Sequence, residues 1–193
     1  METPTLPPSP AAQTSSGDIL ASAPKAQSSM RKPVSALAAE MGFRRPLLVA
    51  DHGLVTAGHV ALAERHLAGA GLDVVHFHEF DVNPDTTMVE AGCAVARPHE
   101  IDSIIGLGGG SSMDCAKGIN LLLTNGGRIE DYRGYGKATR PMLPMIAVPT
   151  TAGTGSETTG VAIFDLSDLH AKTGIAHRRL KPTLGVIDAN NTK

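Results

Sequence analysis

The sequence is poor in aromatic residues and in cysteine. It contains no tryptophan, two tyrosines and four phenylalanines, so a hydrophobic core has to rest on Ile, Leu, Val, Met and Ala. The two cysteines, Cys93 and Cys115, are isolated and lack the spacing of a metal site. We therefore expect both to be reduced, buried thiols on helices rather than a disulfide or a nucleophile.

An excess of positive charge and a long apolar run are also missing. The net charge of −2 provides no basic field for nucleic acid or anionic lipid, so neither nucleic acid nor a membrane is an expected partner. No apolar run has the length of a transmembrane helix or of the core of a signal peptide. A transit peptide would be rich in arginine and poor in acids, whereas Glu2 and Asp18 precede the first arginine, Arg31. We expect a cytoplasmic protein.

Composition divides the chain into two parts. Residues 1–33 are dominated by Pro, Ser, Ala, Thr and Gln, which predicts a disordered segment. Residues 34–193 have the size of one ordinary domain, and their alternation of strands and helices is typical of a parallel sheet. A small hairpin is expected around residues 165–172. The predicted strands are 47–50, 73–77, 103–107, 145–148, 161–165 and 184–187, and the predicted helices are 34–41, 58–69, 85–96 and 113–123.

The usual dinucleotide fingerprint, G-x-G-x-x-G after a strand, is absent. Instead, the apolar run 103–107 leads into Gly108, Gly109 and Gly110, and Ser111 and Ser112 open the following helix. Glycines allow a ligand to approach the bare backbone, and the free N–H groups and dipole at a helix start attract an anion. This loop predicts a pyrophosphate site. The alternative is a tight turn in which Ser111 or Ser112 is the N-cap.

A second loop of similar kind follows the apolar run 145–148. Pro149 suits the end of a strand, because proline cannot donate to a sheet ladder. Thr150, Thr151, Thr154 and Ser156 then supply four hydroxyl groups, with glycines between them. A polar surface loop with hydroxyl-backbone turns is the alternative. Ligands of open α/β sheets bind beyond the carboxyl ends of the strands, where both loops are expected.

Residues 108–117 and 149–157 resemble the corresponding loops of the iron-containing (group III) alcohol dehydrogenases, and the resemblance covers residues 37–188. Residues 157–165 and 172–175 are particularly similar to the hydroxyacid–oxoacid transhydrogenase branch. The resemblance implies a Rossmann-like parallel sheet with flanking helices, as in the N-terminal domain of dehydroquinate synthase. It also implies an oxidoreductase that moves hydride from an alcohol or 2-hydroxy acid to NAD+. Glycerol dehydrogenase and dehydroquinate synthase themselves use glycine-rich loops too, but the second loop argues against them.

The resemblance further implies a set of cofactor-binding residues. Asp51 would accept the hydroxyls of the adenosine ribose and repel a 2′-phosphate, which favours NAD over NADP, although an acid after a strand is also a common helix cap. Asp114 would either touch the ligand or complement the dipole of its helix. Lys172 would reach towards the nicotinamide side. The complete predicted set is Asp51, Asn83, Gly109, Gly110, Ser111, Asp114, Thr150, Thr151, Thr154, Thr159 and Lys172.

The chain also departs from the family that it resembles. Family members carry a helical C-terminal domain whose aspartate and three histidines hold Fe2+ or Zn2+, and none of these ligands has a counterpart here. His76 and His78 share one face of a strand, but no carboxylate at suitable spacing supports them as a metal site.

We therefore expect a truncated NAD-binding domain without metal ligands or catalytic residues of its own, and inactive alone. Its full-length form would act on a small alcohol or hydroxy acid, and it could form a homo-oligomer. The alternative is a catalytically silent nucleotide-binding remnant of the family.

Overall fold

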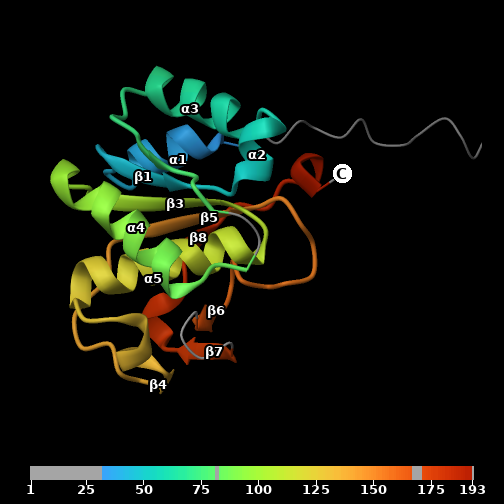
Figure 1. Ribbon diagram of the computed structural model, residues 1–193. Coiled ribbons are helices and arrows are strands. Elements are labelled where there is room, and N and C mark those ends of the chain that lie inside the picture. The colour runs from blue at the N-terminus through green and yellow to red at the C-terminus, as the bar shows by residue number, and fades with distance from the viewer. Residues whose placement is uncertain (1–31, 81–82, 167–170, 193) are drawn as a thin grey trace, which may run out of the picture. The chain divides into compact units, whose positions relative to one another are not determined.

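The computed structural model describes residues 32–80, 83–166 and 171–192, and the fold is built on one parallel sheet. Its strand order is β2-β1-β3-β5-β8, and every neighbouring pair is parallel. Figure 1 shows this sheet between two layers of helices. The strands are β1 (Pro46–Val49), β2 (Val75–Phe77), β3 (Ser103–Gly108), β5 (Met145–Pro149) and β8 (Leu184–Gly185).

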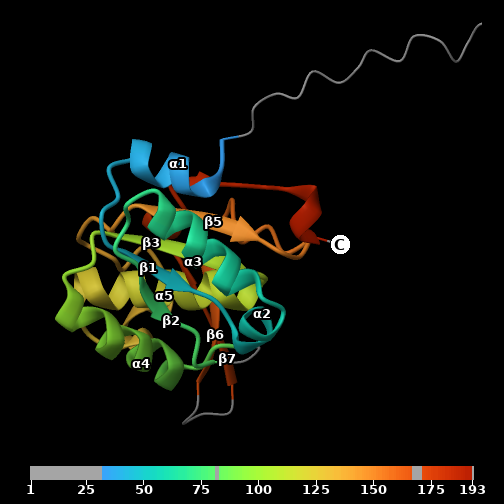
Figure 2. The same cartoon turned by 90° about the horizontal axis from the view of Figure 1, so that it is seen from above.

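Helices cover both faces of this sheet. On one face lie α1 (Val34–Glu40) and α3 (His59–Gly69), and on the other lie α4 (Thr86–Ala96) and α5 (Gly110–Asn125) (Figures 1 and 2). Leu47 and Val49 of β1 belong to the core on the α4 and α5 side, whereas Leu48 belongs to the core under α1 and α3. Because alternate side chains point to opposite faces and both faces are covered, the strands read as unbroken apolar runs.

A second, three-stranded sheet lies beside α5. It consists of β4 (Gly134–Tyr135), β6 (Val161–Leu166) and β7 (Ala171–Ala176), in the order β4-β7-β6. The pairing of β6 with β7 is antiparallel and places Asp165 opposite Lys172, which confirms the predicted hairpin. Phe164 of β6 is fully buried, and a Cβ atom at Gly118 of α5 would lie 2.8 Å from its ring, so the missing side chain lets helix and sheet pack closely.

Most predicted elements are present with shifted ends, and one helix and the strands β4 and β7 lie outside the predicted ranges. The short helix α2 (His52–Thr56) follows β1, in a segment without a periodic apolar pattern. The helix predicted at 113–123 begins at Gly110, and its N-cap is Gly109 with no side-chain cap. The alternative that Ser111 or Ser112 caps this helix is therefore wrong, because both serines lie inside its first turn. Short 3-10 turns complete the chain: Arg97–His99, Ile129–Tyr132, Arg178–Leu180 and Ala189–Thr192.

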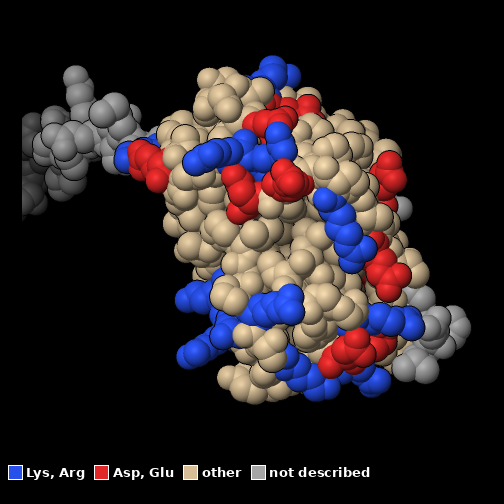
Figure 3. Space-filling view, turned by 90° about the vertical axis from the view of Figure 1, so that its left-hand side faces the viewer, with Lys and Arg blue, Asp and Glu red and all other residues tan. Residues whose placement is uncertain are grey.

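The disorder predicted for residues 1–33 falls almost entirely outside the described residues. Of that segment, Lys32 and Pro33 are described: Pro33 occupies the N-cap of α1, and Lys32 Nζ lies 2.7 Å from Glu40 Oε1. None of the helices in the described ranges is long and apolar enough to cross a bilayer. Figure 3 shows the end of the sheet away from the two loops, where basic and acidic side chains lie side by side.

Candidate cofactor site

The two predicted loops meet at the carboxyl ends of β3 and β5, which are neighbours in the sheet. The Thr150 N–H donates to the Gly108 carbonyl over 3.0 Å. A Cβ atom at Gly109 would lie 3.2 Å from Thr151 Oγ1, and one at Gly110 would lie 3.2 Å from Thr154 Cγ2. The second loop is therefore packed against the glycine backbone, and a side chain at Gly109 or Gly110 would require Thr151 or Thr154 to shift.

The start of α5 has the features of an anion site. The helix has 16 residues, and no side chain of the described residues caps its N-terminus. Its first intrahelical bond runs from the Met113 N–H to the Gly109 carbonyl. The N–H groups of the first turn are therefore available to a ligand, and the helix dipole gives this end a partial positive charge.

Asp51 lies beside this helix start and is held by two donors. Its Oδ1 accepts from the Leu54 N–H over 3.2 Å, which makes it the N-cap of α2. Its Oδ2 accepts from the Ser112 hydroxyl over 2.8 Å. The helix-cap alternative is thus confirmed for one oxygen. A carboxylate oxygen has two lone pairs, so both oxygens keep capacity for a ligand hydroxyl.

Asp114 of α5 accepts hydrogen bonds from the second loop and from β6. Its Oδ1 accepts from the Ser156 hydroxyl over 2.7 Å, and its Oδ2 accepts from the Ile163 N–H over 3.0 Å. The ammonium of Lys117 lies 3.6 Å from Oδ1. Desolvation raises the pKa of Asp114, while the bonds from Ser156 and Ile163 and the charge of Lys117 lower it. This carboxylate stabilises the second loop and β6, a role that dipole complementarity alone does not describe.

Lys117 is the functional neighbour that sequence reasoning missed. Its side chain is fully buried, and Nζ donates to Ser156 Oγ and to the Val161 carbonyl, each over 2.7 Å. Desolvation lowers the pKa of this lysine, and the Asp114 charge opposes that shift. The signal available in the sequence was the spacing of Asp114 and Lys117, three residues apart on one helix.

Four predicted residues line one small pocket of about 70 Å³ beside the helix start: Asn83, Ser111, Asp114 and Lys172. The Asn83 N–H donates to Ser111 Oγ over 3.2 Å, and Lys172 Nζ lies 3.4 Å from Asn83 Oδ1. Asn83 adopts a positive φ of 61°, a conformation that asparagine tolerates better than most residues. The remaining wall includes Ile163, a residue that is 42% exposed.

Thr159, like the other predicted residues of the second loop, does not line this pocket. It is exposed and lies at the end of the second loop, before β6. The neighbouring Thr158 hydroxyl donates to the Gly155 carbonyl over 3.0 Å, a local turn of the kind weighed as the alternative for this loop.

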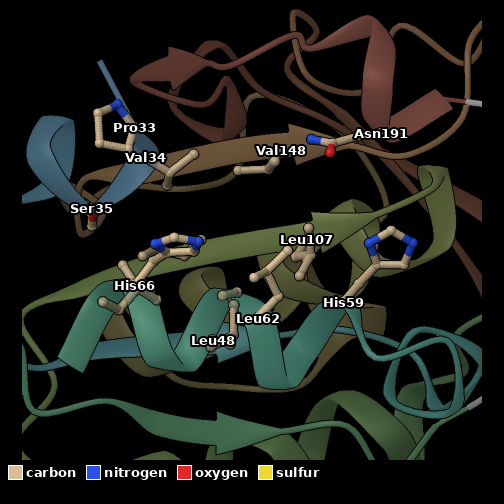
Figure 4. A pocket seen from close by; sticks show the side chains of 13 residues that line it. Pro33, Val34, Ser35, Leu48, His59, Leu62, His66, Leu107, Val148 and Asn191 are labelled. Carbon is tan, nitrogen blue, oxygen red and sulfur yellow. The ribbon is translucent and has the colours of Figure 1, made fainter. Parts of the chain in front are cut away.

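A larger apolar pocket of about 150 Å³ lies on the other side of the sheet, between α1, α3 and β5 (Figure 4). Leu48, Leu62, Leu107 and Val148 line it, with His59 and His66 at its edge, and none of the predicted cofactor residues takes part.

The described residues contain no group of three or more His, Cys, Asp or Glu side chains arranged to hold a metal ion. His76 Nδ1 lies 3.2 Å from Glu64 Oε1 of α3, so a carboxylate does approach it, but from a distant part of the sequence and without a third ligand. These side chains therefore do not fit a catalytic iron or zinc site.

Comparison with known proteins identifies the family. The sequence model described as iron-containing alcohol dehydrogenase matches residues 27–189. The chain belongs to the iron-containing alcohol dehydrogenase family. This confirms the resemblance carried by the two loops.

Relatives within this family include the NAD-dependent methanol dehydrogenase of Bacillus methanolicus, which is 36% identical over 157 residues, 81% of this chain and 41% of that protein. The mitochondrial hydroxyacid-oxoacid transhydrogenase of Xenopus tropicalis is 40% identical over 158 residues, 79% of this chain and 34% of that protein. The chain therefore spans well under half the length of these relatives.

Solved structures of the family have the same fold. A 1,3-propanediol oxidoreductase superposes with a TM-score of 0.78 at 35% identity, covering 82% of this chain and 41% of that one. Sulfoacetaldehyde reductase from Bifidobacterium kashiwanohense in complex with NAD+ superposes with a TM-score of 0.71 at 31% identity, covering 82% and 42%. The parallel sheet and its helices thus match the N-terminal domain of these enzymes, as predicted.

Proposed function

We propose that this chain is the NAD-binding part of an oxidoreductase of the iron-containing alcohol dehydrogenase family. The observation that supports this best is the contact of Gly109 with Thr151 and of Gly110 with Thr154 at the N-terminus of α5. The two segments come from separate strands and together form a cradle of backbone N–H groups and hydroxyls. Such a cradle suits a pyrophosphate, which needs many donors and no bulky side chain.

The surroundings fit the rest of the cofactor. Asp51 would accept hydroxyls of the adenosine ribose from its position beside Ser112, and Asn83 and Lys172, which line the small pocket, would contact the rest of the cofactor. The exposed Ile163 offers an apolar surface for a flat ring beside these polar groups. Bound NAD+ supplies a hydride acceptor. The residues of this chain bind and orient it, and the described residues provide no side chains to hold a metal, so no step through a metal is assigned to them.

We further propose that the substrate of the whole enzyme is a small alcohol or a 2-hydroxy acid. This proposal rests on the likeness to relatives named methanol dehydrogenase and hydroxyacid-oxoacid transhydrogenase. The carbon that bears the hydroxyl in either substrate would give its hydrogen as hydride to NAD+, and the hydroxyl would lose its proton, which leaves a carbonyl and NADH. Whether the 193-residue chain performs this reaction is a separate question from whether it binds the cofactor.

Calorimetric titration with NAD+ tests the binding proposal. The folded wild-type chain should bind NAD+, and a Gly109→Val variant should lose at least about tenfold in affinity, since its side chain enters the space beside Thr151. Gly69→Val is the matched control, because a Cβ atom at Gly69 meets nothing within 4 Å and this residue lies at the end of α3. A folded wild-type chain without affinity for NAD+ would overturn the proposal.

An alcohol-oxidation assay with added Fe2+ or Zn2+, followed by NADH absorbance, separates the two functions. NAD+ binding with turnover supports a self-sufficient enzyme. NAD+ binding without turnover supports a cofactor-binding domain or the catalytically silent nucleotide-binding protein.

A further inference from the structure

Ser112 makes a contact that the cofactor-binding role of its loop does not require. Its side chain is fully buried, and its hydroxyl donates to Asp51 Oδ2 over 2.8 Å across 61 positions of sequence. The other carboxylate oxygen accepts from the Leu54 N–H. The carboxylate of Asp51 is therefore held at both oxygens by groups from two different helices, and its orientation is fixed before any ligand arrives.

The space for this contact depends on Gly108. This residue has a φ of 141°, and a Cβ atom there would lie 2.7 Å from Ser112 Cβ and 2.8 Å from Leu54 Cδ1. The same atom would contact Ser112 Oγ. Gly108 thus leaves room for Ser112 to reach the carboxylate.

A fixed carboxylate discriminates between the two dinucleotides better than a mobile one. The 2′-hydroxyl of NAD can donate to Asp51, whereas the 2′-phosphate of NADP brings negative charge against it. An unrestrained aspartate could rotate away from the phosphate and lose that discrimination, since side chains occupy several rotamers of similar energy. Holding the carboxylate in place prevents this escape.

We propose that Ser112 is a positioning residue that sets the preference for NAD over NADP through Asp51. This inference rests on the proposed cofactor function of the site. Ser112 does not itself contact the ribose in this account, and its hydroxyl acts on the cofactor only by orienting the carboxylate.

The chain offers a close control for a purely structural role. Ser103, at the start of β3, is also fully buried, and its hydroxyl donates to Asp102 Oδ1 over 2.6 Å. Asp102 in turn accepts from the N–H groups of Arg44 and Arg45. This serine-aspartate pair has the same chemistry as Ser112 and Asp51 but lies at the opposite end of the strand from the loops.

The test compares dissociation constants for NAD+ and NADP+ in wild type, Ser112→Ala, Ser103→Ala, Asp51→Asn and the double variant Ser112→Ala/Asp51→Asn. In Ser112→Ala the preference for NAD+ should fall by about fivefold, the usual effect of one hydrogen bond. In Ser103→Ala the preference should stay unchanged. In the Asp51→Asn background, adding Ser112→Ala should leave the preference unchanged, because the group through which it acts is already neutral.

Three results would overturn the inference. Equally weaker binding of NAD+ and NADP+ by Ser112→Ala would indicate a structural role. An undiminished effect of Ser112→Ala in the Asp51→Asn background would show that Ser112 does not act through Asp51. A wild-type chain that binds both cofactors equally would remove the preference itself. A wild-type chain that binds neither cofactor would instead overturn the proposed function, so the two failures are distinguishable.

Discussion

Replacing Lys117 with methionine should destabilise the protein more than any comparable lysine substitution on its surface. Lys117 Nζ has two close acceptors, Ser156 Oγ and the Val161 carbonyl, and a third, Asp114 Oδ1, at 3.6 Å. Methionine is similar in length and keeps the contacts of the apolar stem, so the variant removes the ammonium and little else.

The magnitude follows from the groups left behind. The Val161 carbonyl loses its side-chain donor, and the Asp114 carboxylate, whose side chain is 14% exposed, loses its cation. Breaking a buried ion pair by removing one partner costs about 3–5 kcal/mol. Because the variant no longer has to desolvate the lysine ammonium, part of this cost is offset, and we expect the free energy of unfolding to fall by ~3 kcal/mol. For a domain of this size that corresponds to a lower Tm by about 6–12 °C.

Urea unfolding followed by circular dichroism measures this effect, with the exposed Lys137→Met as the matched control. Burial raises the pKa of Asp114, so this carboxyl holds its proton to a higher pH in the folded protein than in the unfolded chain. Such a carboxyl contributes stability below its unfolded pKa and loses it as the pH rises through its folded pKa. Without Lys117 that pKa rises further, so the penalty of Lys117→Met should shrink as the pH is lowered.

Adding Asp114→Asn to Lys117→Met should recover part of the loss at neutral pH, because the double variant leaves no uncompensated charge. A loss below about 1 kcal/mol for Lys117→Met at pH 7 would refute this account of the network.

Further outcomes follow from other buried groups. Burial raises the pKa of Cys93 to about 11 and that of Cys115 further, so both thiols should resist a thiol reagent at pH 8 in the native protein and react after unfolding; rapid native labelling would contradict this. Because these thiols keep their protons to a higher pH in the folded state, the free energy of unfolding should fall as the pH rises above about 9. In unfolding titrations at alkaline pH, Cys93→Ala should make that fall shallower. Phe164→Ala should cost about 3–5 kcal/mol in urea unfolding, since the ring is fully buried where β6 packs against α5, and a cost below about 1 kcal/mol would exclude that packing role. Asp85→Ala should cost about 1 kcal/mol in the same assay, because Asp85 Oδ1 caps α4 at the Met88 N–H over 2.8 Å, and an unchanged stability would show that the cap contributes nothing.

Local sequence patterns predicted the central architecture. The apolar runs that became β1, β3 and β5 are buried on both faces, which is why each reads as an uninterrupted run rather than as an alternation. The hairpin of β6 and β7 was also predicted, because the short apolar runs at 145–148, 161–165 and 184–187 have no long helices between them. Helix α2 was not, since its five residues are too few to show a period.

The candidate site was predicted unevenly. The residue types of the two loops predicted an anion site. The structure brings Gly109 and Thr151 together because the strands that lead into the two loops, β3 and β5, are adjacent and parallel. The alternative in which Ser111 or Ser112 caps the helix is wrong, because both residue types favour cap positions but both serines lie within the first turn of α5. Lys117 was overlooked, since its spacing from Asp114 indicates a pair on one helix but does not show that the lysine is buried.

The sequence by itself determined most of the strands and helices, where the glycine-rich and hydroxyl-rich loops lie, and to which family the loops are similar. These properties depend on neighbouring residues, whose periodicity and backbone freedom act over short distances along the chain. Only the tertiary structure decided that Ser112 reaches Asp51 and that Lys117 joins Ser156 and the Val161 carbonyl. Those partners are far apart in sequence, and they meet because the strand order of the sheet brings their elements together, a consequence of long-range packing that no local pattern encodes.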